Sequence, residues 1–126
     1  MRFIPTRIHG ILDYLYAIAL FCAPFLFWTT DKSWDLWIPM IVAGVVILYS
    51  ILTRYEWGGI SLISMKSHLR LDLIIGIFMV AAPWIFGFSD RAWRPFLIFG
   101  LLAIILSFIT KKTITHRALG VGHKYK

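Results

Sequence analysis

The sequence predicts an all-α membrane protein with four transmembrane helices, arranged as a tandem repeat of two helical hairpins. Of its 126 residues, 60% are hydrophobic and 15% are charged, whereas ordinary soluble domains have about 45–50% apolar and about 25% charged residues. The charged residues leave four long uncharged segments, and one pattern of residues occurs twice. A chain this short cannot bury so much apolar surface internally, so we expect that surface to face lipid.

Four segments of 16–18 residues contain no Asp, Glu, Lys, Arg or His. At a rise of about 1.5 Å per residue, each segment and its flanking residues reach across the hydrocarbon core of a bilayer. We therefore place transmembrane helices at residues 8–29, 35–53, 69–88 and 94–110. The first is too long for the apolar region of a cleavable signal peptide and has no small-residue cleavage site after it, so we expect it to stay in the protein.

The two hairpins repeat one another. HGILDYLYAIALFCAPFLFWTTDKSW, residues 9–34, aligns without a gap with HLRLDLIIGIFMVAAPWIFGFSDRAW, residues 68–93, at an offset of 59. The identical positions in the first copy are His9, Leu12, Asp13, Ile18, Ala23, Pro24, Phe27, Asp31 and Trp34. Because each copy supplies two spans, both enter from the same side, which predicts parallel repeats related by a pseudo-two-fold axis along the membrane normal.

This repeat divides the chain into residues 1–56 as the first hairpin, 57–66 as an interfacial hinge, 67–110 as the second hairpin and 111–126 as a basic cytoplasmic tail. Within the hinge, Gly58 and Gly59 precede the mildly apolar ISLISM. We expect this stretch to lie along the interface as a short helix.

The distribution of Lys and Arg predicts the orientation. Ten of the 13 lie on the side shared by the N-terminus, the segment that links the second and third spans, and the C-terminus, and three lie in the two hairpin loops. The positive-inside rule therefore places both termini in the cytoplasm. Nucleic-acid binding is a poor explanation of the net charge of +7, because the cations are spread over three segments and form no groove-docking motif.

The run AAPWIFGFSDRAW, which follows HLRLDLIIGIFMV and precedes an apolar helix, resembles the SPW-repeat family of prokaryotic integral membrane proteins. The resemblance covers nearly all of residues 4–110. Ala82-Pro83-Trp84 and Ala23-Pro24-Phe25 both lack the serine of the family's Ser-Pro-Trp motif, and the second also lacks the tryptophan. The resemblance implies a location in the membrane and a paired-helix repeat, and it implies no reaction, cofactor or substrate. Together with the distribution of Lys and Arg, it leads us to expect the cytoplasmic (inner) membrane of a prokaryote.

The prolines and tryptophans have structural explanations. Pro24 and Pro83 each remove a backbone hydrogen bond, so we expect a kink toward the outer end of a span, and a hinge at a binding site is the alternative. Tryptophans settle at the headgroup level of a bilayer, and an aromatic cage for a quaternary ammonium ligand is the alternative. The predicted interface aromatics are Trp28, Trp34, Trp37, Trp84 and Trp93 on the outer side and Trp57 on the inner side.

Ionisable residues within the apolar segments are the candidate site. His9 and Asp13 are four residues apart, as are His68 and Asp72, so each pair lies on one helix face. Small residues and the prolines continue both faces, which comprise His9, Asp13, Ala17 and Pro24, and His68, Asp72, Gly76 and Pro83. Polar residues beside small ones indicate the face that meets other helices, because lipid penalises a carboxylate.

Three functions compete for these residues. In the first, which we favour, the pairs hydrogen-bond each other and nearby basic groups, and the protein is a scaffold, assembly factor or accessory subunit. The second is a proton or ion path, or another transport role, through the two pairs. The third is ligation of a haem or metal by His9 and His68. Two histidines alone make an incomplete zinc or iron site, so we expect no metal and no cofactor.

Catalysis is not expected, because the sequence has no glycine-rich phosphate loop, no nucleophile elbow and no pair of cysteines. Cys22 is the single cysteine and lies within the first span, so it is expected to be a free thiol. Besides the lipid bilayer, we expect a homo-oligomer or a larger membrane complex as partner, because four short spans bury little helix surface between them. The sequence leaves any small-molecule ligand unknown.

Overall fold

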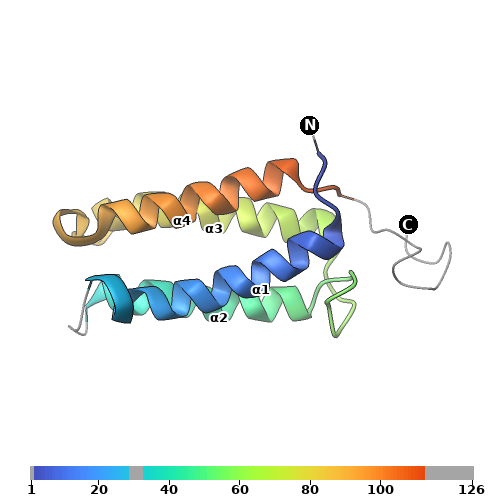
Figure 1. Cartoon of the computed structure of the whole chain (residues 1–126), viewed down its shortest axis with the longest axis horizontal. Coiled ribbons are helices and arrows are strands. Elements are labelled where there is room, and N and C mark those ends of the chain that lie inside the picture. Colours follow the sequence, from blue (N-terminus) through green and yellow to red (C-terminus); the bar gives the residue numbers. More distant parts are fainter. Residues whose placement is uncertain (1, 29–32, 113–126) are drawn as a thin grey trace, which may run out of the picture.

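A bundle of four helices makes up the computed structural model, which describes residues 2–28 and 33–112 (Figure 1). The helices are α1, Thr6–Ala23, which continues as a π-helical turn η1, Pro24–Trp28; α2, Trp34–Ile51; α3, Met65–Ile85; and α4, Ser89–Ile109. Each is long and apolar enough to cross a membrane. The prediction of an all-α membrane protein with four spanning helices is therefore confirmed.

All four helices begin earlier than predicted, and α3 and α4 do so by four and five residues. α3 starts at Met65 because Ser64 caps it, with the Ser64 hydroxyl accepting a hydrogen bond from the backbone N–H of Ser67 at 3.2 Å. α4 starts at Ser89, and its backbone leaves helical geometry at Ala92, with φ −144° and ψ 28°. The first turn of α4 is thus separated by a kink from its longer apolar part, which begins near the predicted residue 94.

Residues 57–64 of the hinge contain no helix, and α3 begins at Met65, so the expected short interfacial helix over ISLISM is wrong. Its backbone folds back on the end of α2 instead: the N–H of Ile63 donates to Leu52 O at 2.8 Å, and the N–H of Arg54 donates to Ile63 O at 2.7 Å. The N–H of Gly59 donates to Ile51 O at 2.8 Å. These bonds satisfy backbone groups that a helix would otherwise pair internally.

Both hairpins run in the same direction, with α1 and α3 beginning at one end of the bundle (Figure 1). The described chain also starts and stops there, and the N–H groups of Phe3 and Ile4 donate to Ile109 O at 2.8 and 3.0 Å. Residues 113–126 of the predicted basic tail lie outside the described residues. The pseudo-two-fold axis along the membrane normal stays a prediction.

Small residues allow the two helices of the second hairpin to pack closely. A Cβ atom added to Gly76 of α3 would lie 2.7 Å from Gly100 O, and one added to Gly100 of α4 would lie 2.7 Å from Gly76 O. Close backbone approach of this kind favours dispersion contacts between spanning helices.

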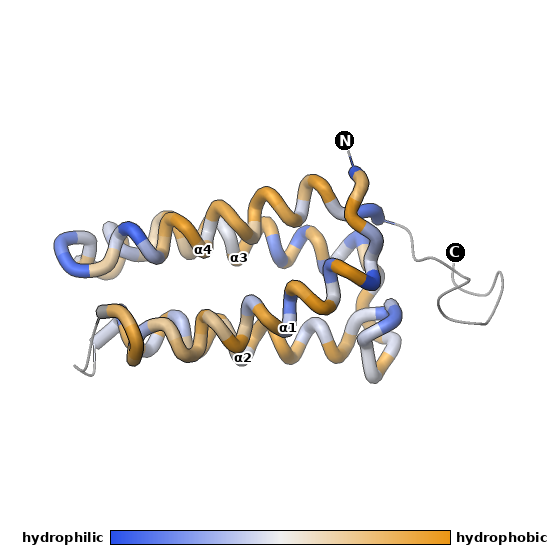
Figure 2. The backbone as a smooth tube through the Cα atoms, in the orientation of Figure 1, coloured by the Kyte–Doolittle hydropathy of each residue, from blue (hydrophilic) through white to orange (hydrophobic). Residues whose placement is uncertain are grey.

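The helices are apolar along most of their length, and hydrophilic residues gather toward the two ends of the bundle (Figure 2). Leu15, Ile18, Ile74 and Ile98 are each more than half exposed. Exposed aliphatic side chains in the middle of a helix are unfavourable in water and favourable in lipid, which agrees with four membrane spans.

Candidate functional site

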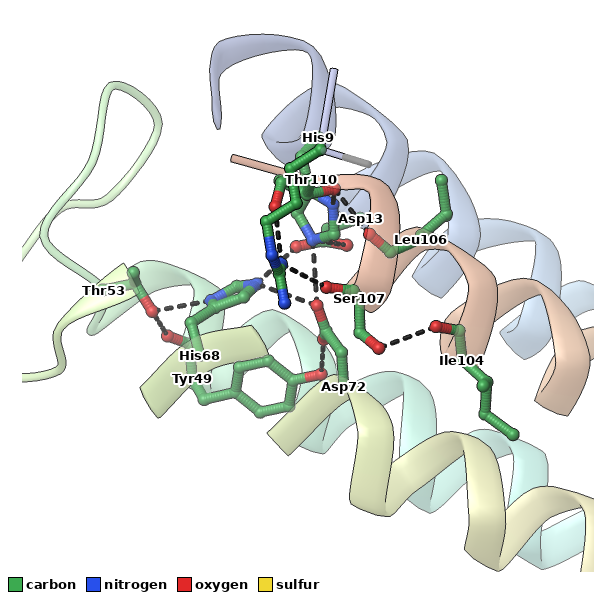
Figure 3. Close-up of polar contacts among 11 residues, drawn as sticks. His9, Asp13, Tyr49, Thr53, His68, Asp72, Ile104, Leu106, Ser107 and Thr110 are labelled. Atoms are coloured by element: carbon green, nitrogen blue, oxygen red, sulfur yellow. Dashed lines mark hydrogen bonds and ion pairs between the residues drawn. The ribbon is translucent and has the colours of Figure 1, made fainter. Parts of the chain in front are cut away.

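Four ionisable side chains meet inside the bundle, near the end where α1 and α3 begin. We call His9, Asp13, His68 and Asp72 the His–Asp cluster (Figure 3). Both histidines are fully buried, and each aspartate is 5% exposed. The small residues and prolines predicted to share their helix faces, Ala17, Pro24, Gly76 and Pro83, are buried as well. Each predicted face therefore points into the bundle.

The short contacts of the cluster cross from one hairpin to the other. His9 Nε2 lies 2.9 Å from Asp72 Oδ2, and His68 Nε2 lies 2.6 Å from Asp13 Oδ2. The contacts within one helix are longer, at 3.1 Å for His9 with Asp13 and 3.5 Å for His68 with Asp72. Each histidine thus contacts the aspartates of both hairpins and lies closer to that of the other hairpin.

Two threonines complete the cluster, and sequence reasoning missed both. His9 Nδ1 lies 2.7 Å from Thr110 Oγ1, and His68 Nδ1 lies 2.8 Å from Thr53 Oγ1. Here too the two partners come from different hairpins. A signal existed in the sequence, because Leu52-Thr53-Arg54 and Ile109-Thr110-Lys111 repeat an apolar, Thr, basic pattern just after α2 and α4.

The threonines determine which imidazole nitrogen carries a proton. Each hydroxyl donates to the carbonyl four residues earlier, Thr53 to Tyr49 O at 2.5 Å and Thr110 to Leu106 O at 2.6 Å. A hydroxyl has one proton, so its oxygen must accept from the imidazole Nδ1–H. This assignment follows from the hydrogen-bond network. Nε2 of each histidine is left to face the carboxylates.

Charge balance within the cluster follows from these tautomers. An unprotonated Nε2 facing an ionised carboxylate would bring two acceptors together, so one proton must lie between each histidine and its aspartate. Two such protons make the cluster of two imidazoles and two carboxylates neutral overall. Neutrality matters because an uncompensated charge buried among apolar helices is costly.

Tyrosines close the cluster on the side of α2. The Tyr49 hydroxyl donates to Asp72 Oδ1, and its ring packs edge-on against His68 with 4.9 Å between ring centroids. The ring of Tyr55, which lies just before the hinge, has its centroid 5.6 Å from that of the His68 ring. Burial raises the pKa of the Tyr55 phenol, so Tyr55 covers the cluster as a neutral group.

Among the described residues, the ion pairs of both aspartates are with the two histidines, and the expected contact with basic groups is not seen.

Little open space adjoins the cluster. The cavity lined by His9, Asp13, Tyr49 and Asp72 has a volume of about 10 Å³, roughly enough for one water-sized sphere. The imidazole ring centroids of His9 and His68 are 5.5 Å apart, with carboxylate oxygens in hydrogen-bond contact with both rings. A haem between these two histidines does not fit this arrangement.

The remaining predicted site residues lie away from the cluster. Pro24 follows α1 at the start of η1, and Pro83 lies in the last turn of α3. The side chain of Trp28 lies outside the described part of the structure. The other interface aromatics, each 39–57% exposed, are Trp34, Trp37, Trp57, Trp84 and Trp93. Trp57 donates its ring N–H to Arg7 O at 2.9 Å, which attaches the hinge to the start of α1.

Comparison with known proteins places this arrangement in a family. The family model described as SPW repeat domain matches residues 7–110. The matched range contains the whole His–Asp cluster together with Thr53 and Thr110. No curated protein and no solved structure matches the chain significantly.

Proposed function

The chain belongs to the SPW repeat family, and from this premise we propose that it is a structural or accessory subunit of a membrane assembly. In this role the His–Asp cluster joins two hairpins into one stable unit, and the apolar outer surface binds lipid and neighbouring proteins. The role requires no catalysed reaction and no nucleic acid.

One observation supports the proposal most directly: every short polar contact of the cluster joins residues of different hairpins. These contacts pair His9 with Asp72 and Thr110, and His68 with Asp13 and Thr53. Removing one partner of a buried ion pair leaves the other uncompensated and destabilises a protein by about 3–5 kcal/mol. Such a network therefore holds the hairpins in one relative position, which suits a subunit that presents a fixed surface.

The charge pattern supports a location in the cytoplasmic membrane with both termini in the cytoplasm. Basic side chains gather at the end of the bundle that holds the cluster, where a pocket of about 110 Å³ is lined by Arg2, Lys66, Arg70 and Lys112. A basic pocket between spanning helices suits the anionic headgroups of the cytoplasmic leaflet. Arg2 also donates to Ser107 O and Thr110 O, at 2.9 and 2.7 Å, so this charge is held in place.

The outer surface leaves room for partners. In the most apolar part of each span, between 28% and 50% of the residues are buried within the bundle. The rest of each helix faces lipid or a neighbouring chain, because contacts among four helices this short cover little of that surface. A homo-oligomer or a larger membrane complex follows from this exposure.

A proton or ion path through the cluster receives less support. Its carboxylates already contact two histidines and a tyrosine, and the adjoining cavity of about 10 Å³ holds roughly one water. Conduction requires a chain of exchangeable sites across the bilayer, and the four ionisable residues of the cluster lie near one end of the bundle.

Mass measurement of the intact chain in a mild detergent tests the proposed role. We expect the wild-type protein to migrate as a homo-oligomer or with co-purifying membrane proteins. A single monomeric mass at all protein concentrations, without co-purifying partners, contradicts the proposal. The Asp90→Ala variant serves as a control, because Asp90 is exposed and lies at the far end of the bundle from the cluster.

A further inference from the structure

We propose that the His–Asp cluster is a structural site for a divalent transition metal, with Zn²⁺ as the ion that fits best. The ligands are Nε2 of His9, Nε2 of His68 and one carboxylate oxygen from each of Asp13 and Asp72. This inference rests on the same residues as the proposed structural role and adds the identity of the group that joins them.

The donor atoms already converge on one point. Each of the four residues offers one ligand atom, and these atoms all lie within 4.8 Å of one another. The shortest nitrogen-to-oxygen distances between the two histidines and the two aspartates are 2.6, 2.9, 3.1 and 3.5 Å, and the histidines face different oxygens of Asp13. Tetrahedral Zn²⁺ with ligand bonds of about 2.0–2.1 Å places neighbouring ligands about 3.3 Å apart. The farthest of these atoms, up to 4.8 Å apart, must therefore approach one another by about 1.5 Å to convert the hydrogen-bonded cluster into a coordination sphere.

The surrounding hydroxyls orient the ligands as a metal site requires. A histidine that ligates through Nε2 usually donates its Nδ1–H to an oxygen, which fixes the ring and its tautomer. Thr53 and Thr110 accept these two Nδ1–H bonds, since each hydroxyl proton is committed to a backbone carbonyl. Tyr49 donates to the other oxygen of Asp72 and fixes that carboxylate.

Charge also matches a divalent ion. Two carboxylates and one M²⁺ sum to zero, so the metal replaces the two protons that otherwise lie between the histidines and the aspartates. Binding then releases two protons per ion, and both carboxylates stay ionised within the coordination sphere. A neutral site is what burial among spanning helices demands.

The ligand set and the closed surroundings select the kind of metal. Imidazole nitrogen favours Zn²⁺ and its neighbours in the first transition row, whereas Mg²⁺ and Ca²⁺ prefer sites made of oxygen alone. Four protein ligands fill a tetrahedron, and the adjoining cavity of about 10 Å³ leaves no room for a substrate. Closed tetrahedral sites are structural, since catalytic ones keep a position open for water or substrate.

Metal analysis of the purified chain tests the inference. The protein is prepared in mild detergent without a polyhistidine tag, as the His116→Ala/His123→Ala variant, which removes the only histidines outside the cluster. We expect one zinc ion per chain to survive extensive dialysis. After removal of the metal with a chelator, added Co²⁺ should give the intense visible absorption of tetrahedral cobalt, and Zn²⁺ should abolish it and raise the melting temperature.

Variants distinguish this site from metal bound elsewhere. Thr53→Val keeps the ligands and the side-chain volume but removes the acceptor of the His68 Nδ1–H, and should weaken cobalt affinity about 10–100-fold. Asp90→Ala should leave that affinity unchanged. Because two protons leave on binding, affinity should also fall as the pH is lowered.

Two results overturn the inference: a wild-type cluster that neither holds metal nor shows tetrahedral cobalt absorption, or equal cobalt affinity in the Thr53→Val variant. The proposed scaffold role is judged separately. A metal-free chain that still forms an assembly would contradict the metal site and leave the scaffold role standing. A metal-loaded chain that stays monomeric without partners would contradict the scaffold role and leave the metal site standing.

Discussion

Nε2 of His68 lies 2.6 Å from Oδ2 of Asp13, and these two residues belong to different helical hairpins. The equivalent contact of the other pair, His9 with Asp72, measures 2.9 Å. Each histidine also contacts a threonine from the opposite hairpin. A repeat that exchanges its polar partners in this reciprocal way joins its two hairpins through buried contacts inside the bundle.

Removing a carboxylate should destabilise the protein. In Asp72→Ala, the Nε2 of His9 loses its closest carboxylate and the Tyr49 hydroxyl loses its acceptor. We expect a loss of about 3–5 kcal/mol in the free energy of unfolding, measured by denaturant titration in detergent. Asp72→Asn should lose less, because an amide keeps hydrogen-bonding capacity. Stability of Asp72→Ala equal to that of the exposed-site control Asp90→Ala would count against the structural role of the cluster.

The threonine hydroxyls should stabilise the protein because they accept hydrogen bonds from the histidines, and not because of the volume that the side chains fill. Thr110→Val keeps the shape of the side chain but leaves the His9 Nδ1–H without an acceptor, which should cost about 1–3 kcal/mol. Thr110→Ser restores a hydroxyl and should recover most of that loss. Thermal unfolding of the two variants side by side checks this. If the Thr110→Ser and Thr110→Val variants were equally destabilised, loss of the hydrogen bond from His9 would not be the cause of the destabilisation.

Close packing of α3 against α4 predicts a contrast between two glycines. Gly76→Ala places a methyl group 2.7 Å from Gly100 O, so the helices must separate, at a cost of about 1–3 kcal/mol. Gly44→Ala meets no atom within 4 Å and should stabilise α2 slightly, since alanine is the better helix former. Thermal unfolding of both variants tests this contrast. A Gly76→Ala variant as stable as the wild type would show that α3 and α4 tolerate a wider spacing.

Membrane orientation is testable with reporter fusions. Ten of 13 Lys and Arg residues lie on the side of the termini and the hinge, so a reporter fused to the C-terminus should be active only in the cytoplasm. A reporter inserted after Thr30, in the first hairpin loop, should be active only outside it. An extracytoplasmic C-terminus would reverse the orientation proposed for the basic pocket.

Sequence patterns predicted the helices and the buried faces because both depend on local spacing. A separation of four residues places His9 and Asp13 on one face whatever the rest of the chain does. The identity of the facing residue is not local: it depends on how the hairpins pack, so the exchange of partners between His9 and His68 could not be read from spacing. The expected contact with basic groups failed for the same reason, since the histidines already occupy the carboxylates.

Thr53 and Thr110 were missed because a threonine at a helix end commonly bonds to its own backbone. Both do so, and their second role, as acceptors from imidazoles, appears only when another hairpin is brought against them. The hinge was misread for a related reason. Its mildly apolar composition suits an interfacial helix, but the end of α2 offers backbone partners that an isolated segment lacks, and Ile63 pairs with Leu52 instead.

The central claim, that the His–Asp cluster joins the two hairpins, is tested most directly by a double-mutant cycle between Asp13 and His68. Free energies of unfolding are measured for Asp13→Ala, His68→Ala and the double variant, with Asp13→Ala and Asp90→Ala as the control pair. We expect a coupling energy of about 1–3 kcal/mol for Asp13 with His68 and values near zero for the distant control. Additive losses at Asp13 and His68 would contradict the claim, because two residues in direct contact across the hairpins cannot destabilise the protein independently.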